Sequence, residues 1–284
     1  MLFGISVVAT RYVVGQTQPV SLAFLRYLIA SVCLLPVLVA VWRAGMPRRD
    51  LLAISALGAL FFGIFPWSFS ASLMYLPSSR VAILVATNPL ITLIISRLKG
   101  LDKLTTTKVA GQALAFGGLL MAFRQSDAHA ASTSDLWTGI GLTLITAVCG
   151  ASYNVFSRPY LMKYPPLHVT ALSMAAGALF LAPIAAGHGL FRSIPAFTPG
   201  GWMAVVFLGV FGGAIGFGLW IWALQRSMPS QVAVFIALNP ITAVLLGAVL
   251  LHEAISLSFI AGLVCVIGGI ALVNKRPAGI AGLR

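Results

Sequence analysis

Acidic residues, and charged residues in general, are scarce in this chain. Its 284 residues include only 5 aspartates and glutamates, and charged residues of either sign make up 8% of the sequence. A soluble domain carries about 25% charged residues, so a water-soluble globule is excluded. Hydrophobic residues make up 60% of the chain, and the mean hydropathy is +1.01. This composition predicts a polytopic membrane protein.

Cysteines are also few, and no cleavable leader is visible. Cys33, Cys149 and Cys265 lie in apolar runs and are odd in number, which argues against a disulfide or metal framework. No basic segment precedes the first apolar run after Met1, so we expect residue 1 to begin a real span. The net charge of +13 would suggest nucleic-acid binding in a soluble chain. Here the basic residues lie between apolar runs, where membrane topology explains them, and no nucleic-acid partner is expected.

Apolar runs separated by polar or proline-containing breaks predict an all-α membrane protein with ten transmembrane helices. A span needs about 20 apolar residues, and the chain has room for ten with short connections. The predicted spans are residues 2–17, 20–42, 51–74, 81–98, 107–123, 136–157, 167–186, 200–224, 230–250 and 257–273.

The basic residues in the short loops predict the orientation. With the amino terminus inside, 13 lysines and arginines fall on the cytoplasmic side and 3 on the outer side. The positive-inside rule then places both termini in the cytoplasm, as a multi-pass protein of the bacterial inner membrane. The inner set is Arg43, Arg48, Arg49, Arg97, Lys99, Lys103, Lys108, Arg158, Lys163, Arg226, Lys275, Arg276 and Arg284.

The two halves of the chain resemble each other. Residues 79–102 align without gaps on residues 230–253 at a shift of 151, which superimposes Asn88-Pro89 on Asn239-Pro240. Earlier in each half a shift of 147 pairs Arg11 with Arg158 and two prolines with two others. Five spans per half is an odd number, so the second half enters the membrane from the opposite side. Residues 1–125 and 136–275 are therefore predicted to form two inverted five-helix repeats around a central cavity.

This pattern resembles the drug/metabolite transporter superfamily, in its ten-helix, EamA-type branch. The resemblance is carried by PVSLAFLRYLIAS from Pro19, by the two Asn-Pro helices, and by LLHEAISLSFIAGLVCVIGGIAL in the second half. The first half departs from the pattern, because it reads Gly100-Leu101-Asp102 where the family has Gly-Glu. Among members, the chain is most similar to YddG-like bacterial exporters of aromatic amino acids, and this resemblance implies amino-acid export.

The Asn-Pro pairs are the first candidate site. A proline within a helix cannot donate to the carbonyl four residues earlier, and freed backbone groups at this depth are tolerated only where protein or water satisfies them. We predict that Asn88 and Asn239 line the cavity and bind substrate, while Pro89 and Pro240 kink their helices for gating. The alternative is a packing kink in which each asparagine bonds a neighbouring helix.

The third span of each half carries a matching weak point. In the first half it is Pro66, and in the second it is a glycine run that includes Gly213 and Gly216. These residues are predicted to flex during gating, although the Gly-x-x-x-Gly spacing is equally typical of close helix packing.

Aromatic and basic residues inside the spans complete the predicted substrate site. Six aromatic residues are expected to face the cavity, where rings stack on flat apolar solutes. They are Trp67, Trp220, Trp222, Tyr12, Tyr75 and Tyr153. Core or lipid-facing packing is the alternative for each. Arg11 either binds a substrate carboxylate or extends to the interface. Arg26 occupies an arginine position of the family pattern and either ties helices together or meets a carboxylate.

Acidic side chains are absent from the predicted spans, and this narrows the mechanism. Proton-coupled carriers generally need an embedded titratable group, and cation exporters need an anionic counter-charge. The sequence therefore favours facilitated, uniport-like flux of neutral or zwitterionic solutes by alternating access. No lysine is embedded, which disfavours nucleotide-sugar or sugar-phosphate exchange. No nucleophile–base pair or metal motif occurs within the spans, so neither an enzyme nor a cofactor or metal site is expected.

The predicted function is movement of small neutral or zwitterionic metabolites across the inner membrane, and the resemblance implies export of amino acids, aromatic ones first. The protein is expected to interact with membrane lipids and to work as a monomer. Two alternatives remain open. One is efflux of drug-like or toxic aromatic compounds, including flat cations. The other is a membrane sensor or scaffold that transports nothing, which the polar kinks at mid-depth argue against.

Overall fold

The computed structural model describes residues 2–13, 16–43, 45–72, 74–76, 81, 84–85, 87–101, 105–122, 133–190, 197–237 and 257–274. Every regular element in these segments is helical. Within these described segments, four continuous helical stretches are long and apolar enough to cross a membrane. They are Arg48–Ser72, Ser134–Lys163, Pro166–Gly187 and Pro199–Arg226.

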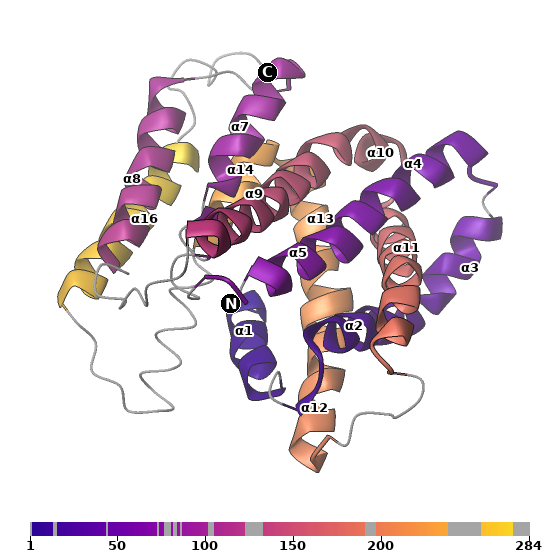
Figure 1. The fold of residues 1–284 in the computed structure, drawn as a ribbon. Helices are drawn as coiled ribbons and strands as arrows, with labels where there is room; N and C mark the ends of the chain where they lie inside the picture. Colours follow the sequence, from indigo (N-terminus) through magenta and orange to yellow (C-terminus); the bar gives the residue numbers. More distant parts are fainter. Residues whose placement is uncertain are drawn as a thin grey trace.

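These four stretches are built from several labelled elements (Figure 1). The first comprises α4 (Arg48–Gly58), η2 (Ala59–Ile64) and α5 (Phe65–Ser72), and the second α9 (Thr133–Phe156) and α10 (Arg158–Lys163). The third is α11 (Pro166–Gly187), and the fourth comprises α12 (Pro199–Phe207), η3 (Leu208–Ile215) and α13 (Gly216–Arg226).

The predicted span 20–42 is a bent pair of helices. α2 (Pro19–Cys33) and α3 (Leu35–Arg43) meet at an angle of 61°. Pro36 lies just beyond the break, and because proline has no backbone N–H it cannot donate to the carbonyl of Val32. If the pair is one span, the described residues hold five helices of membrane-crossing length.

The remaining elements are shorter. They are α1 (Leu2–Val13), α7 (Asn88–Leu98), α8 (Thr106–Ala122), α14 (Pro229–Ala233), η4 (Val234–Ala237) and α16 (Leu257–Asn274). α8 and α16 coincide within a residue or so with the predicted spans 107–123 and 257–273. Most of the predicted span 230–250 lies outside the described residues. The count of ten spans and the inverted orientation of the halves therefore stay predictions.

The third span of each half contains a π-helical segment. η2 directly precedes Phe65 and Pro66, and η3 holds the glycine run from Gly209 to Gly213. π-helical turns are rare in proteins and mark points where the regular i→i−4 hydrogen bonding is interrupted. The two weak points expected from the sequence are thus places where the helix is irregular.

Glycines allow these irregular helices to approach helices of the other half. A Cβ added to Gly58 would collide with the backbone of Ser173 on α11, and one added to Gly209 would lie 3.1 Å from the carbonyl oxygen of Arg26 on α2. In the sequence repeat, Gly58 corresponds to Gly209 at a shift of 151, and Arg26 to Ser173 at a shift of 147. Each contact is therefore the counterpart of the other.

A second pair of contacts follows the same correspondence. A Cβ on Gly177 would collide with Phe62, and a Cβ on Gly213 would lie 2.8 Å from the Cβ of Ala30. Gly177 corresponds to Ala30, and Phe62 to Gly213. In both cases the second helix of one half packs against the third helix of the other.

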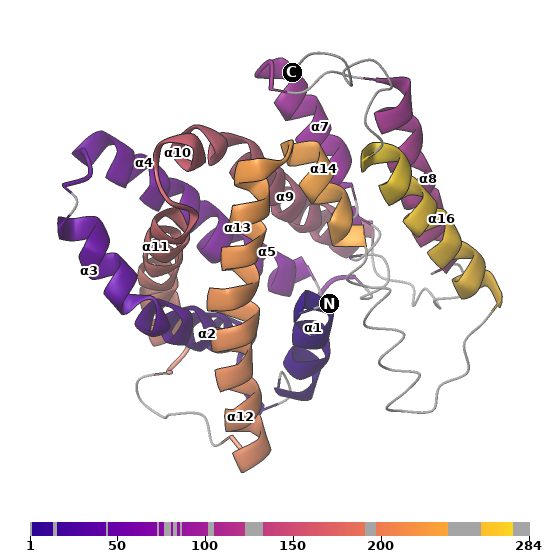
Figure 2. The ribbon, with the colours of Figure 1, turned by 180° about the vertical axis from the view of Figure 1, so that it is seen from behind.

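α8 and α16 form a separate layer beside the main bundle and lie side by side in both views (Figures 1 and 2). Their backbones touch at two glycine contacts. A Cβ on Gly111 would lie 2.7 Å from the carbonyl oxygen of Gly269, and a Cβ on Gly118 would lie 2.5 Å from that of Gly262. The repeat at a shift of 151 maps the first contact onto the second. Small residues permit such close approach between membrane helices.

Candidate functional site

Aromatic rings fill the centre of the main bundle, between α2, η2, α9 and α13. Tyr153 stacks on Phe61 with ring centroids 4.5 Å apart and an interplanar angle of 15°. Phe62 lies edge-on to Tyr27 at 5.1 Å and to Phe217 at 4.9 Å. Such pairs contribute about 0.5–1.5 kcal/mol beyond the burial of their area. The close packing of η2 on α11 at Gly177 places Phe61 and Phe62 in this centre rather than on the outer surface.

Two hydrogen bonds place polar atoms among these rings. The hydroxyl of Tyr153 donates to Oγ of Ser173 at 3.2 Å, and the indole Nε1 of Trp220 donates to Oδ1 of Asn154 at 3.2 Å. Tyr153, Asn154 and Ser173 are all buried. Their atoms could hydrogen-bond a polar solute if the helices separated at this point.

Arg26 brings a positive charge to the same aromatic cluster. Its guanidinium carbon lies 5.5 Å from the ring centroid of Tyr27 and 5.9 Å from that of Phe217. Its Nε is buried and has no hydrogen-bond partner. Within the described part of the chain Arg26 forms no salt bridge, whereas Asp50 is paired with Lys163 at the end of α10. A buried donor without a partner is costly, and an anion bound here would satisfy it.

The site is asymmetric where the two halves correspond. Arg26 and Ser6 in the first half take the places of Ser173 and Tyr153 in the second, at a shift of 147. Both Ser6 and Arg26 lie against Gly212, because a Cβ there would be 2.5 Å from Ser6 Oγ and 3.5 Å from Arg26 Nη2. One side of the centre therefore carries a cation next to small residues, and the other carries stacked rings.

The structure brings two of the predicted substrate residues, Tyr153 and Trp220, into this centre. Three others of the expected set lie at the surface: Trp67 is 41% exposed, Trp222 49% and Tyr12 59%. Tyr75 packs against Gly139 near the start of α9, and the fourteen residues from there to Tyr153 span about 20 Å of helix. Tyr75 is therefore far from the central rings. Nothing is described of the side chain of Arg11, and Asn239 and Pro240 lie outside the described residues.

Asn88 is buried at the start of α7 and bonds a neighbouring helix. Its Nδ2 donates to the carbonyl oxygen of Ala147 on α9 at 2.8 Å, and its Oδ1 accepts from Oγ1 of Thr92 at 3.4 Å. Pro89 lies in the first turn of α7, where the missing N–H costs no helical hydrogen bond. In this conformation Asn88 makes the packing contact that the sequence left as an alternative.

Asn88→Ala and Asn239→Ala are each expected to reduce transport while expression persists. For Asn88 the reason is the loss of the bond that holds α7 against α9 at the start of its helix, worth roughly 1 kcal/mol. Transport by purified, reconstituted variants of matched amount checks this, with Thr107→Ala, outside the site, as the control. Wild-type flux in both variants would remove the two asparagines from the mechanism.

Several residues of the centre carry no sequence signal that could have singled them out. Phe61, Phe62 and Phe217 are three of 17 phenylalanines in an apolar chain. Asn154 could have been found, because asparagines within the predicted spans are rare and Asn154 adjoins Tyr153. Ser173 is one of many serines and threonines in the spans. Arg26 was identified from the sequence, but its position over the rings was not.

The described apolar helices agree with the comparison to known families. The model of the EamA-like transporter family matches residues 1–124 and 137–275. This chain belongs to the EamA-like transporter family. It is thus a membrane protein, as the composition predicted, and a member of a transporter family, as the resemblance implied. Its homologues are named as transporters.

Relatives of this EamA-family protein align over nearly its whole length. A protein of Archaeoglobus fulgidus described as an uncharacterized transporter is 27% identical, over 96% of this chain and 95% of its own. A probable terminal-alkyne amino-acid exporter of Streptantibioticus cattleyicolor is also 27% identical, over 91% of this chain and 84% of its own. A crystal structure with 22% identity superimposes with a TM-score of 0.79, over 96% of this chain and 92% of the other, and thus has the same fold.

Proposed function

We propose that this EamA-family protein exports small zwitterionic or neutral metabolites, amino acids including aromatic ones first, by facilitated alternating access. The observation that carries the proposal is the partly buried guanidinium of Arg26, whose Nε is buried without a hydrogen-bond partner, next to the rings of Tyr27 and Phe217. Among the described residues no carboxylate pairs with it. A relative named as a probable amino-acid exporter supports the substrate class.

The carboxylate and the side-chain ring of an aromatic amino acid each match a part of this centre. A carboxylate can accept two parallel hydrogen bonds from a guanidinium, and such charge-assisted bonds are about twice as strong as neutral ones. The side-chain ring can stack among Phe61, Tyr153 and Phe217. Asn154 Oδ1, which accepts from Trp220 in this structure, can accept from an ammonium group.

Arg26 also separates the proposed function from its main alternative. A flat drug-like cation would meet a like charge beside the rings, and like charges are repelled strongly where the dielectric is low. We therefore favour zwitterionic amino acids over cationic aromatic compounds. YddG-like selectivity for phenylalanine, tyrosine and tryptophan is the narrower form of the same proposal.

We further infer that the two halves are inverted repeats that exchange conformations during transport. The paired glycine contacts support this inference, because each contact between the halves has a counterpart under the sequence correspondence. In inverted-repeat transporters, rocking of one repeat against the other moves access from one side to the other. Bending would occur at the irregular segments η2 and η3. Gly213 lies within η3, Gly216 directly follows it, and Pro66 lies two residues beyond the end of η2.

The membrane placement follows from the loop charges. Thirteen basic residues on one side and three on the other favour ten spans in a bacterial inner membrane, with both termini in the cytoplasm. A single chain contains both halves of the proposed pathway, so we propose that the monomer is the transporting unit.

Transport by the purified protein in liposomes tests the function directly. A panel of radiolabelled amino acids should show saturable flux of phenylalanine, tyrosine or tryptophan that runs down the substrate gradient. A pH-sensitive dye inside the same liposomes should report no stoichiometric proton movement, because no carboxylate is embedded in the predicted spans. Strict proton coupling would overturn the uniport mechanism. Transport of quaternary cations without amino acids would establish the efflux alternative, and no flux of any solute would favour a sensor or scaffold.

A further inference from the structure

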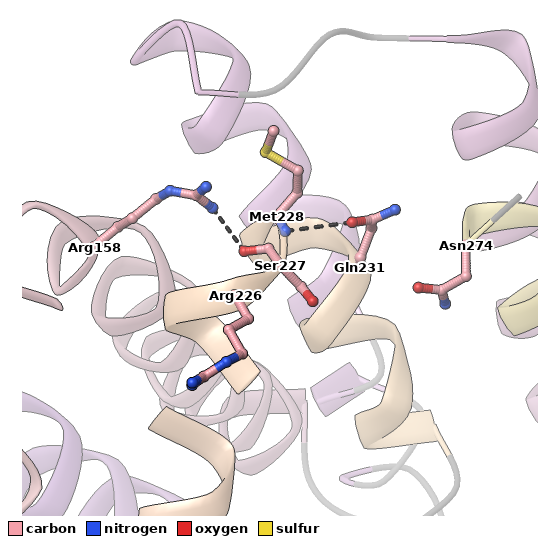
Figure 3. A pocket seen from close by; sticks show the side chains of 6 residues that line it. All are labelled: Arg158, Arg226, Ser227, Met228, Gln231 and Asn274. Atoms are coloured by element: carbon pink, nitrogen blue, oxygen red, sulfur yellow. Dashed lines mark hydrogen bonds between the residues drawn. The ribbon is translucent and has the colours of Figure 1, made fainter. Parts of the chain in front are cut away.

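A second basic site lies away from the aromatic centre, where α13 gives way to α14. A cavity of about 330 Å³ is lined by Arg158, Arg226, Ser227, Met228, Gln231 and Asn274. Arg158 begins α10, Arg226 ends α13, and Asn274 ends α16. Figure 3 shows Arg158 and Asn274 on opposite sides of the α13–α14 connection, with Gln231 between them.

The lining of this cavity is cationic. It contains two arginines and no acidic residue. Arg158 Nη1 donates to the carbonyl oxygen of Ser227 at 2.7 Å, which fixes the direction of the guanidinium but uses one of its five N–H donors. Gln231 accepts from the backbone N–H of Met228 through Oε1 at 3.3 Å, a bond that does not involve its amide NH₂. Two arginines and an amide donor line this cavity, although the Arg226 side chain turns toward Trp222 in this conformation (Figure 3). Donors of this kind favour an anion with several acceptor oxygens.

The neighbourhood of Arg226 points to the membrane interface. Its guanidinium carbon lies 4.2 Å from the ring centroid of Trp222, and Trp222 is 49% exposed. Met228, also exposed, adjoins the cavity. Tryptophan and arginine at the end of a span are typical of the headgroup level of a bilayer. An anion at this depth is most readily supplied by a lipid.

The predicted membrane orientation of the chain also favours a lipid as the source of the anion. Arg158 and Arg226 both belong to the set of basic residues expected on the cytoplasmic side, and Lys275 and Arg276 follow Asn274 directly in the sequence. The cytoplasmic leaflet carries the anionic lipids, and basic pockets between helices on that side bind phosphate headgroups. We propose that this cavity binds the phosphate of an anionic phospholipid, at a site distinct from the transport centre.

Lipid binding by the purified full-length chain tests the proposal. Native mass spectrometry in detergent, with phosphatidylglycerol or phosphatidylcholine titrated in, should show preferential binding of phosphatidylglycerol. Each basic residue near an anionic surface contributes about 1 kcal/mol, which is roughly a fivefold change in affinity. Arg226→Gln should therefore weaken phosphatidylglycerol binding roughly fivefold, and the double variant with Arg158→Gln roughly 25-fold.

Two controls decide between a built site and general surface charge. Arg43→Gln removes an exposed arginine of the same predicted side at the end of α3 and should leave phosphatidylglycerol binding unchanged. Arg226→Lys keeps the positive charge and should retain most of the phosphatidylglycerol binding. Equal losses in the Arg43 and Arg226 variants, or undiminished binding in the double variant, would overturn the proposal. A further outcome is that inorganic phosphate binds to the wild type but not to the double variant, without competition from phosphatidylglycerol. That result would overturn the lipid proposal and identify the cavity as a site for a soluble anion.

Discussion

Arg26→Gln is expected to reduce amino-acid transport roughly 10- to 100-fold. A hydrogen bond to a charged group contributes about 1.5–3 kcal/mol, and the substrate carboxylate would lose this cationic partner in the centre. The neutral amide keeps the approximate length of the side chain and can still donate one hydrogen bond. Initial rates of radiolabelled phenylalanine uptake into liposomes containing purified protein, fitted for KM and kcat, measure the effect.

The stability of the Arg26 variant distinguishes recognition from packing. Removing a partly buried charge with an unpartnered Nε relieves a desolvation cost, while loss of the contacts with Tyr27 and Phe217 costs about 0.5–1 kcal/mol. The melting temperature should therefore change little. A variant that transports normally would exclude Arg26 from substrate binding, and one that fails to fold would identify it as structural.

Two further comparisons sharpen this test. Arg26→Lys keeps the charge but loses the bidentate fork, so an intermediate rate is expected, whereas Arg48→Gln, at the exposed start of α4, should transport normally. Phenylalanine amide has no carboxylate. The wild type should discriminate against it, and the Arg26→Gln variant should not. Equal discrimination in both proteins would contradict a carboxylate contact.

The sequence predicted the helices of this protein better than its site. α8 and α16 begin and end close to their predicted limits because long apolar runs, bounded by charges and prolines, leave few other ways to cross a membrane. The break at Leu34 was not predicted. Pro36 and Pro183 occupy equivalent positions in the repeat, yet only Pro36 adjoins a break, while Pro183 lies within the continuous helix α11. A proline at this position is therefore not sufficient to break the helix, and the packing of neighbouring helices must contribute.

The composition of the central cluster depends on the direction in which each helix faces. Tyr153 and Tyr75 are both expected from the sequence to face the cavity, but α9 carries Tyr153 into the centre, and Tyr75 packs beside the opposite end of that helix. Phe61 and Phe62 reach the centre because Gly58, Gly63 and Gly177 let η2 lie against α11. A single sequence contains these glycines but does not specify which helix each one contacts.

The largest change in stability is predicted for substitutions at the glycine contacts between α8 and α16. A Cβ on Gly118 would lie 2.5 Å from the carbonyl oxygen of Gly262 and 2.7 Å from the Cβ of Cys265, whereas a Cβ on the adjacent Gly117 would meet nothing within 4 Å. Because backbone atoms cannot move aside easily, Gly118→Ala should lower the free energy of unfolding by roughly 1–3 kcal/mol or more. Gly117→Ala should be neutral or stabilise by up to about 1 kcal/mol, since alanine favours helix.

The inverted repeat extends this prediction to the second half. Gly269 corresponds to Gly118 and is in backbone contact with Gly111, while Gly268 corresponds to Gly117 and has only an ordinary contact, 3.5 Å to a Leu114 methyl group. Gly269→Ala should therefore destabilise about as much as Gly118→Ala, and Gly268→Ala as little as Gly117→Ala. Thermal unfolding of the four purified variants in one detergent measures this. A large effect at Gly118 with none at Gly269 would mean that the two glycine contacts between α8 and α16 are not equivalent. The symmetric exchange of conformations proposed for transport would then lose its structural basis.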